Sequence, residues 1–143
     1  MVIQAKKEDI PAAAALAAQL FSGPVEKLAE EFDSLIPSEA CAVFLLMVAD
    51  RPAGFAQCQL RRDYVEGAHT SPVGYLEGIF VLPEYRSQGR AKELLAHCEQ
   101  WAREQGCTEF ASDCELENSG SLAFHLKMGF AEANRIICFT KEL

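Results

Sequence analysis

One stretch decides the fold of this 143-residue chain: residues 73–91, which read VGYLEGIFVLPEYRSQGRA. Its first part, Val73–Leu82, is an apolar run long enough for a buried strand, and Pro83 closes it. From Gly89 to Gln105 apolar residues recur at helical spacing with charged residues between them, which predicts an amphipathic helix. The stretch therefore predicts a strand, a tight loop and a helix in direct succession.

The segments on either side alternate between strand and helix patterns. Beside the central strand and helix we expect a strand at Val2–Ala5, a helix opened by Asp9-Ile10-Pro11 and continuing to Phe21, a helix at 25–35, strands at Ala42–Ala49 and Ala53–Leu60 joined by a turn at 50–52, a loop at Arg61–Pro72, a strand at Thr108–Ser112, a helix at Ser119–Lys127 and a last strand at Arg135–Thr140. This order is typical of an α/β (α+β) fold with a mixed sheet and helices on both faces. The strands on either side of the central helix should be parallel neighbours. No linker or repeat divides the chain, so we expect residues 1–143 to form a single domain.

Charge and cysteine usage exclude several classes of function. The chain has 13 Lys and Arg against 21 Asp and Glu, a formal net charge of −8, whereas a nucleic-acid partner requires clustered basic residues. We therefore expect a cationic or neutral partner and no nucleic acid, although solubility alone also favours acidic surfaces. No apolar run is long enough for a membrane span, and no apolar signal region follows Met1. The six cysteines show neither a Cys-x-x-Cys pair nor zinc spacing with histidine, which predicts free thiols, no metal and a cytoplasmic location.

The loop between the central strand and helix has the properties of an anion site. Successive backbone N–H groups meet the positive end of a helix there, and Gly89 lets a phosphate approach the main chain closely. Arg86 and Arg90 can add charge-assisted hydrogen bonds. Neither Gly-x-x-x-x-Gly-Lys nor Gly-x-Gly-x-x-Gly is present, so this is neither a Walker loop nor a dinucleotide fingerprint. The loop fits a diphosphate, although a turn of this kind also occurs without any ligand.

The details of this loop resemble a known family. Arg86-x-x-Gly89-x-Ala91 after a strand ending Ile79-Phe80-Val81 is similar to the acetyl-coenzyme A site of the GCN5-related N-acetyltransferase (GNAT) superfamily, and the expected order of elements matches that fold, with its mixed, splayed sheet. The sequences GFAQ at 54–57, DYVEG at 63–67, SPVGYLEGIFV at 71–81 and EFASD at 109–113 resemble the aminoglycoside 6′-N-acetyltransferases. The resemblance covers about residues 43–142, and residues 1–42 match only loosely.

This resemblance implies acetyl-coenzyme A as co-substrate, with no metal. The main chain of Ile79 to Val81, through Phe80, would pair with the pantetheine arm as an added strand does. The pyrophosphate would be held by the amides of Arg86, Ser87, Gln88, Gly89, Arg90, Ala91 and Lys92. The side chain of Asn118 would hydrogen-bond the cofactor arm, although it can equally serve as the N-cap of the helix that follows it.

Two acidic residues are candidates for handling the acceptor amine. An alkylamine is mostly protonated at neutral pH, so an enzyme must bind the cation and then remove a proton as the nitrogen attacks. Glu77 lies two residues before Ile79, and Asp113 follows the neighbouring parallel strand. The resemblance implies that both contact an aminoglycoside and that Asp113 is the general base. Alternatively, Glu77 is satisfied by Arg61 or Arg62, and Asp113 is an Asx-turn residue.

Further substrate residues are implied by position. Tyr64 would form a flat wall over a sugar ring. Relatives commonly have a tryptophan near the end of the first helix, and Phe21 is the nearest aromatic substitute for it here. Asn134 stands where some relatives have glutamate. Many members of the superfamily have a tyrosine as general acid where this chain has His125, so the acid is His125, water or direct protonation. Negative charge around the strand ends comes from Glu66, Glu115, Glu117 and Glu132.

The function expected from the sequence is transfer of an acetyl group from acetyl-coenzyme A to the 6′-amine of an aminoglycoside antibiotic, by direct attack in a ternary complex. Two alternatives remain at this point: another small amine as acceptor, such as a polyamine, a metabolite or a peptide N-terminus, and a non-catalytic acyl-coenzyme A binding module. The family's members commonly form homodimers, and the apolar run at 136–139 permits pairing of late strands.

Overall fold

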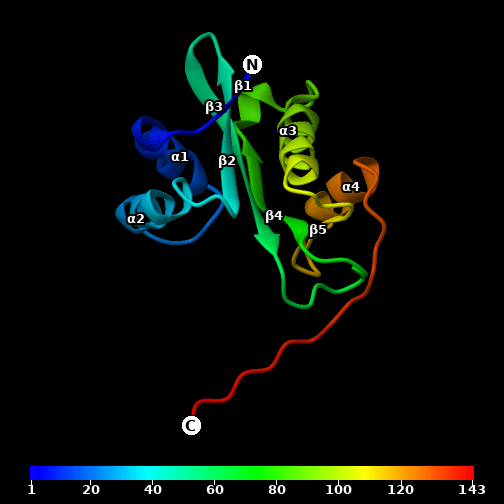
Figure 1. The fold of residues 1–143 in the computed structure, drawn as a ribbon. Coiled ribbons are helices and arrows are strands. Elements are labelled where there is room, and N and C mark those ends of the chain that lie inside the picture. The colour runs from blue at the N-terminus through cyan, green and yellow to red at the C-terminus, as the bar shows by residue number, and fades with distance from the viewer.

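The computed structural model describes residues 1–143 and contains one five-stranded mixed sheet with strands in the order β1-β2-β3-β4-β5 (Figure 1). The elements along the chain are β1 (Val2–Gln4), η1 (Lys7–Asp9), α1 (Ile10–Ala17), α2 (Val25–Leu35), β2 (Cys41–Val48), β3 (Arg51–Arg61), β4 (Val73–Val81), η2 (Pro83–Tyr85), α3 (Arg90–Glu104), β5 (Phe110–Ser112) and α4 (Ser119–Lys127). The first four strands are antiparallel, and β4 and β5 are parallel, as the strand–helix–strand unit requires.

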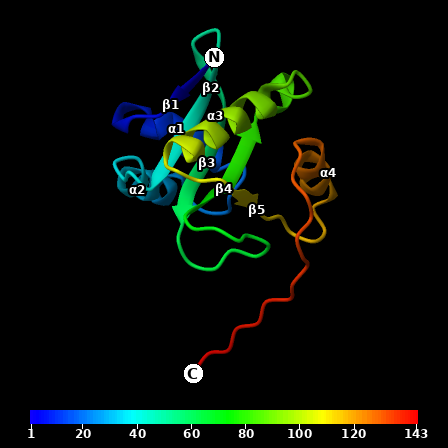
Figure 2. The ribbon, with the colours of Figure 1, turned by 45° about the vertical axis from the view of Figure 1, so that its right-hand side comes forward.

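Helices cover both faces of the sheet (Figure 2). On one face α1 and α2 enclose a core with Val43, Leu45 and Phe55 of the sheet. On the other face α3 packs its stripe of Leu94, Leu95, Cys98, Trp101 and Ala102 against the opposite side of the same strands. The alternation of side chains along β2 and β3 therefore supplies two separate cores, one for each helical layer.

The feature that opens the sheet is a bulge in β4. Gln57 of β3 faces Gly78, and the next residue, Cys58, faces Leu76, so Glu77 has no partner on β3. On its other side β4 pairs with β5 at three positions only, Gly74 to Leu76. After the bulge, β4 continues to Val81 with no pairing to β5. Helix α4 lies on the far side of β5 from β4 (Figure 2). The sheet is thus splayed, as expected.

The bulge also decides which main-chain groups point into the open side. The amide of Leu82 donates to the carbonyl of Ala53 at 2.8 Å, and the Phe80 carbonyl points to Gly54 on β3. Because neighbouring residues of a strand alternate in direction, the N–H and C=O groups of Ile79 and Val81 point away from β3. They form an unpaired edge of the kind to which an extended ligand can add.

Most boundaries agree with the sequence-based expectations, with three corrections. The helix expected to reach Phe21 ends at Ala17 and continues as turns. The hairpin turn consists of Ala49 and Asp50, both at positive φ, so β3 begins at Arg51, inside the turn expected at 50–52. The strand expected at Thr108–Ser112 begins at Phe110 and is three residues long.

The last expected strand, Arg135–Thr140, is wrong. Residues 130–143 belong to no helix or strand, and Figure 1 shows the end of the chain running away from the folded body. Ile136, Ile137 and Phe139 are 67%, 81% and 91% exposed. The residues have strand propensity, but a strand also requires an edge to pair with, and this segment reaches none within its own chain.

No helix combines the length and the apolar composition that crossing a membrane requires.

The close approach of β3 to β4 predicts a large effect of one methyl group. A Cβ on Gly54 would lie 2.6 Å from the carbonyl oxygen of Phe80, a main-chain atom that cannot rotate away. We expect Gly54→Ala to lower the free energy of unfolding by about 1–3 kcal/mol in chemical denaturation, as overpacking does. Gly120→Ala in α4 is the matched control, because its Cβ meets nothing closer than 3.8 Å and alanine favours helix. Equal effects of the two substitutions would contradict this account.

Candidate active site

The loop from β4 to α3 presents a row of free amides. Ser87 and Gly89 have φ values of 61° and 74°, and Gly89 is the N-cap of α3. None of the main-chain N–H groups from Ser87 to Lys92 donates to another main-chain group. Six consecutive donors and the positive end of a 15-residue helix therefore converge on one place, which suits a doubly charged phosphate group.

Arg86 has a different position from its neighbours in the loop. Its amide is already used, since it donates to the Pro83 carbonyl at 3.2 Å. Its side-chain Nε donates to the Val81 carbonyl at 2.7 Å, and the guanidinium lies 5.3 Å from the centroid of the Phe80 ring. Arg86 thus ties the start of the loop to the end of β4 and occupies one acceptor site on the free edge.

The side chains of Arg90 and Lys92 differ in their surroundings. The Arg90 side chain lines a hollow beside Met1 and the β2–β3 hairpin, and it pairs with Glu93 at 3.6 Å. The side chain of Lys92 is exposed, as is that of Gln88, whereas Ala91 is half-buried. The Arg90 side chain is therefore engaged by Glu93, and the loop amides remain the unused main-chain donors at the anion site.

Asn118 caps the helix that follows it. Its Oδ1 accepts from the amide of Ser121 at 3.0 Å, which is the N-cap arrangement for α4. The side-chain NH2 group takes no part in that bond. One residue therefore has both a capping oxygen and a free donor for a ligand.

Glu77 is held by an arginine. Arg61 at the end of β3 approaches it with Nη2 at 2.8 Å from Oε1 and 3.1 Å from Oε2, and with Nε at 3.2 Å from Oε1. The Arg61 and Glu77 side chains are 37% and 21% exposed, so the pair is only partly in solvent. The structure therefore agrees with the alternative in which a local arginine binds this carboxylate. Oε2 can still accept a hydrogen bond from a further donor.

Asp113 is held by a tyrosine. The exposed Asp113 follows β5 and accepts a hydrogen bond at Oδ2 from the hydroxyl of Tyr75 on β4. Burial raises the pKa of Tyr75, and the neighbouring Asp113 carboxylate raises it further, so the phenol keeps its proton and remains the donor. The Arg61 guanidinium lies 3.4 Å above the Tyr75 ring. Glu77 and Asp113 are thus brought into one contiguous group through Arg61 and Tyr75.

His125 forms a half-buried polar contact beside this group. Its Nδ1 lies 2.7 Å from the Ser121 carbonyl, which can only accept, so Nδ1 carries the hydrogen. Its Nε2 lies 2.8 Å from the Ser112 hydroxyl. The ring packs edge-on against Phe124 and Phe130. His125 therefore contacts β5 one residue before Asp113.

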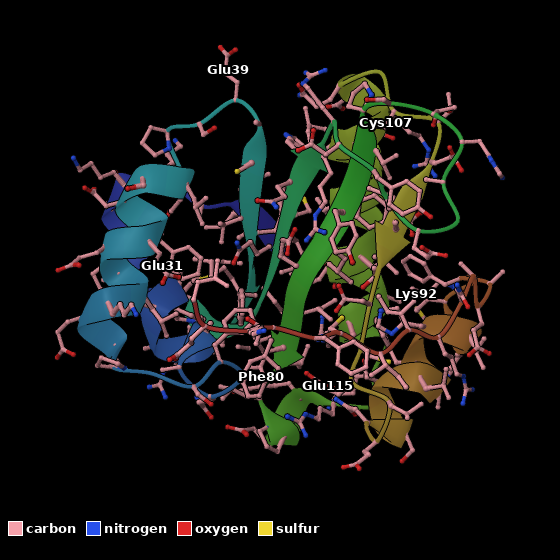
Figure 3. The ribbon with its side chains drawn as sticks, turned by 90° about the horizontal axis from the view of Figure 1, so that it is seen from below. Glu31, Glu39, Phe80, Lys92, Cys107 and Glu115 are labelled. Carbon is pink, nitrogen blue, oxygen red and sulfur yellow. The ribbon has the colours of Figure 1, made fainter.

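The remaining candidate substrate residues lie in two places. Tyr64 and Asn134 both donate to Glu66, at 2.8 and 2.9 Å, and these two bonds lower the pKa of Glu66 below its usual range. Phe21 lies instead over the bulge of β4, where its ring fills the space of a Gly78 side chain. Glu132 pairs with Arg135, and Glu115 and Glu117 are exposed. In Figure 3, Glu115 and Phe80 both appear toward the lower edge of the view.

The sequence did not identify the bulge at Glu77 or the contact of Tyr75 with Asp113. The only sequence signal was indirect: Tyr75 and Glu77 are two residues apart, a spacing that places both on one face of a regular strand. The bulge and the partner of Tyr75 depend instead on pairing with β3 and β5.

The sequence of this chain is similar to those of known acetyltransferases. Residues 12–130 match the model of the acetyltransferase (GNAT) family. Aminoglycoside N(6′)-acetyltransferase type 1 of Stenotrophomonas maltophilia is 41% identical over 96% of this chain and 92% of that protein. The protein of the same name from Salmonella typhimurium is 39% identical over 87% of this chain and 86% of its own length.

A solved structure gives the same result in three dimensions. AAC(6′)-Iy in complex with the bisubstrate analogue CoA-S-monomethyl-acetylneamine superposes with a TM-score of 0.95 and 36% identity, covering 100% of this chain and 98% of that one. The chain therefore belongs to the GNAT acetyltransferases and, within them, to the aminoglycoside 6′-N-acetyltransferase family.

Proposed function

We propose that this protein transfers the acetyl group of acetyl-coenzyme A to the 6′-amino group of aminoglycoside antibiotics, by direct attack in a ternary complex. The observation that carries the proposal is the contiguous group of Glu77, Arg61, Tyr75 and Asp113 at the point where β4 and β5 part. A free strand edge and a free-amide loop adjoin this point. The names of the relatives and the bisubstrate analogue in AAC(6′)-Iy support the same chemistry.

The cofactor has a matching surface along β4 and α3. Pantetheine is rich in amides, so its arm can pair with the outward main-chain groups of Ile79 and Val81 as an added strand. Its pyrophosphate fits the amides of Ser87 to Lys92 at the N-terminus of α3. The NH2 of Asn118, which its capping bond leaves unused, would donate to the same arm from the start of α4. The amide of Arg86 is excluded from this set by its bond to Pro83.

The acceptor amine is bound as a cation and reacts as a neutral nucleophile. Glu77 and Asp113 attract the ammonium group, and Asp113 accepts one proton as the nitrogen attacks the thioester carbon. The N–C bond forms, the C–S bond breaks, and the coenzyme leaves as a thiolate, which takes up the second proton that the attacking nitrogen loses, directly or through water. Phe21 beside the bulge, and Tyr64 with Asn134 at the rim, contribute surface for the sugar rings.

The same proposal includes a cytoplasmic location and antibiotic resistance as the biological effect. All six cysteines are free, including the exposed Cys114 and Cys138, which suits a reducing compartment. N-acetylation removes a positive charge from the drug, so the product binds anionic targets less well.

A homodimer also belongs to this proposal. The apolar residues Ile136, Ile137 and Phe139 stand in solvent on an extended segment, and one edge of β5 pairs with no strand of this chain. An exposed extended segment of this kind is stabilised by adding to a strand edge of a second copy.

The first prediction concerns activity. Free thiol released from acetyl-coenzyme A should increase with kanamycin, and much less with spermidine or without an acceptor. Asp113→Asn should lower kcat by about 100-fold, because the proton acceptor is lost, with little change in acetyl-coenzyme A affinity. Asp33→Asn on the surface of α2 is the control for an equal change in charge. Turnover with spermidine alone would assign a different acceptor, and no turnover with any amine would leave a binding module.

The second prediction concerns the cofactor loop. Gly89→Ala forces a Cβ into the left-handed region, which costs about 1–2 kcal/mol and tilts the loop amides, so acetyl-coenzyme A should bind about tenfold more weakly in equilibrium titration. Gly106→Ala provides the control at the other end of α3, since Gly106 has φ of 89° and equally open surroundings. Weaker binding in both variants would show that strain alone, and not the loop, is responsible.

The third prediction concerns assembly. Sedimentation equilibrium at micromolar concentration should give a dimer for the natural protein and a monomer for Ile137→Asp, because a buried unpaired carboxylate is costly. Lys141→Asp places the same group outside the apolar run and should leave the dimer intact. A natural protein that sediments as a monomer would refute this assembly.

A further inference from the structure

We propose that Arg61 and Tyr75 form a brace that positions the two acceptor-site carboxylates, Arg61 holding Glu77 and Tyr75 holding Asp113. Neither residue is required to touch the substrate; each acts through the carboxylate that it holds. This inference rests on the proposed function and adds to it two positioning residues that set the geometry of the amine site.

The Arg61 half of the brace follows from the bulge in β4. Glu77 has no partner on β3, and a bulge of this kind re-aims the side chain that it carries. The planar guanidinium contacts both carboxylate oxygens through Nε and Nη2, at 2.8 to 3.2 Å. A two-point contact fixes the orientation of the carboxylate, which a single hydrogen bond does not.

The Tyr75 half follows from burial of the ring. Tyr75 is 7% exposed and packs with Val65 and Val73, with Ala68 and Ala111 at the edge of that cluster. Its hydroxyl donates to Asp113, an exposed residue on the loop after β5. The phenol has few alternative rotamers in this packing, so it holds Oδ2 in one place and leaves Oδ1 without a partner.

The two halves are joined by a stacking contact. The guanidinium carbon of Arg61 lies 3.4 Å from the centroid of the Tyr75 ring, so the ring is the surface on which the arginine lies flat. The ring therefore orients Arg61, Arg61 orients Glu77, and the same ring orients Asp113 through its hydroxyl. One rigid side chain of β4 thus fixes the relation between a carboxylate on β4 and another on the loop after β5.

The first test removes one oxygen atom. Tyr75→Phe keeps the ring, its packing and the surface under Arg61, but it releases Asp113. We expect kcat/KM for kanamycin to fall about tenfold, with acetyl-coenzyme A affinity and the midpoint of thermal unfolding nearly unchanged. In an Asp113→Asn background the same substitution should change kcat/KM less than twofold. An unchanged kcat/KM in Tyr75→Phe, or an equal loss in both backgrounds, would overturn the brace.

The second test separates geometry from charge. Arg61→Lys keeps the positive charge but has no second donor nitrogen and no planar group to lie on the ring, so it should lose nearly as much kcat/KM for the amine as Arg61→Met. Arg62→Met removes the same charge from an exposed neighbour and should have little effect. Full activity in Arg61→Lys would show that charge suffices. A lower KM for kanamycin in Arg61→Met would show that Arg61 competes with the substrate, and either result overturns the proposal.

The failure of the brace is distinguishable from failure of the proposed function. If the natural protein acetylates no aminoglycoside, the function fails, and the brace is then decided by unfolding measurements alone. Destabilisation by Arg61→Met and Tyr75→Leu should be non-additive in a double-mutant cycle, because each removes the same stacking contact. Additive effects would overturn the brace whatever the activity.

Discussion

The structure depends on the separation of β4 from β5. Backbone N–H and C=O groups that are removed from water need partners, and an ordinary sheet supplies them along the whole strand. Here the pairing stops after Leu76, and the bulge at Glu77 reverses the direction in which the following main-chain groups point. Ile79 and Val81 consequently face the open side, and only the Val81 carbonyl has a partner there, from Arg86. Glu77, the residue of the bulge, contacts Arg61, so one backbone irregularity underlies both the proposed cofactor edge and one half of the proposed amine site.

The sequence was informative where structure is local. The strand, loop and helix at 73–91 are each determined by neighbouring residues, and they form as expected from apolar runs, Pro83 and Gly89. The bulge and the contact between Tyr75 and Asp113 were not predictable in this way, because they depend on register with strands distant in sequence. The segment at 135–140 was mispredicted for the same reason: propensity gives an extended chain, but a strand exists only when another edge accepts its hydrogen bonds.

The net charge of −8 does not by itself locate the amine site. Several carboxylates have local partners: Glu66 accepts from Tyr64 and Asn134, and Glu109 accepts from His69 and Thr70. These hydrogen bonds lower the pKa of Glu66 and Glu109, so both stay charged well into acidic solution. They contribute to a long-range field that attracts cations but is screened by salt. The specific recognition of an amine requires carboxylates with free oxygens at the reaction centre.

The two holders of the site carboxylates differ in charge, and that difference assigns their roles. Arg61 is a cation and neutralises Glu77, so this carboxylate can orient an amine but adds little net attraction. Tyr75 is a neutral donor whose pKa is raised, so it holds Asp113 without cancelling its charge. Asp113 is therefore the carboxylate whose negative charge is not matched within the group, and its Oδ1 is free. A group that must accept a proton from a bound ammonium needs both properties, which is why the structure favours Asp113 over Glu77 as the base.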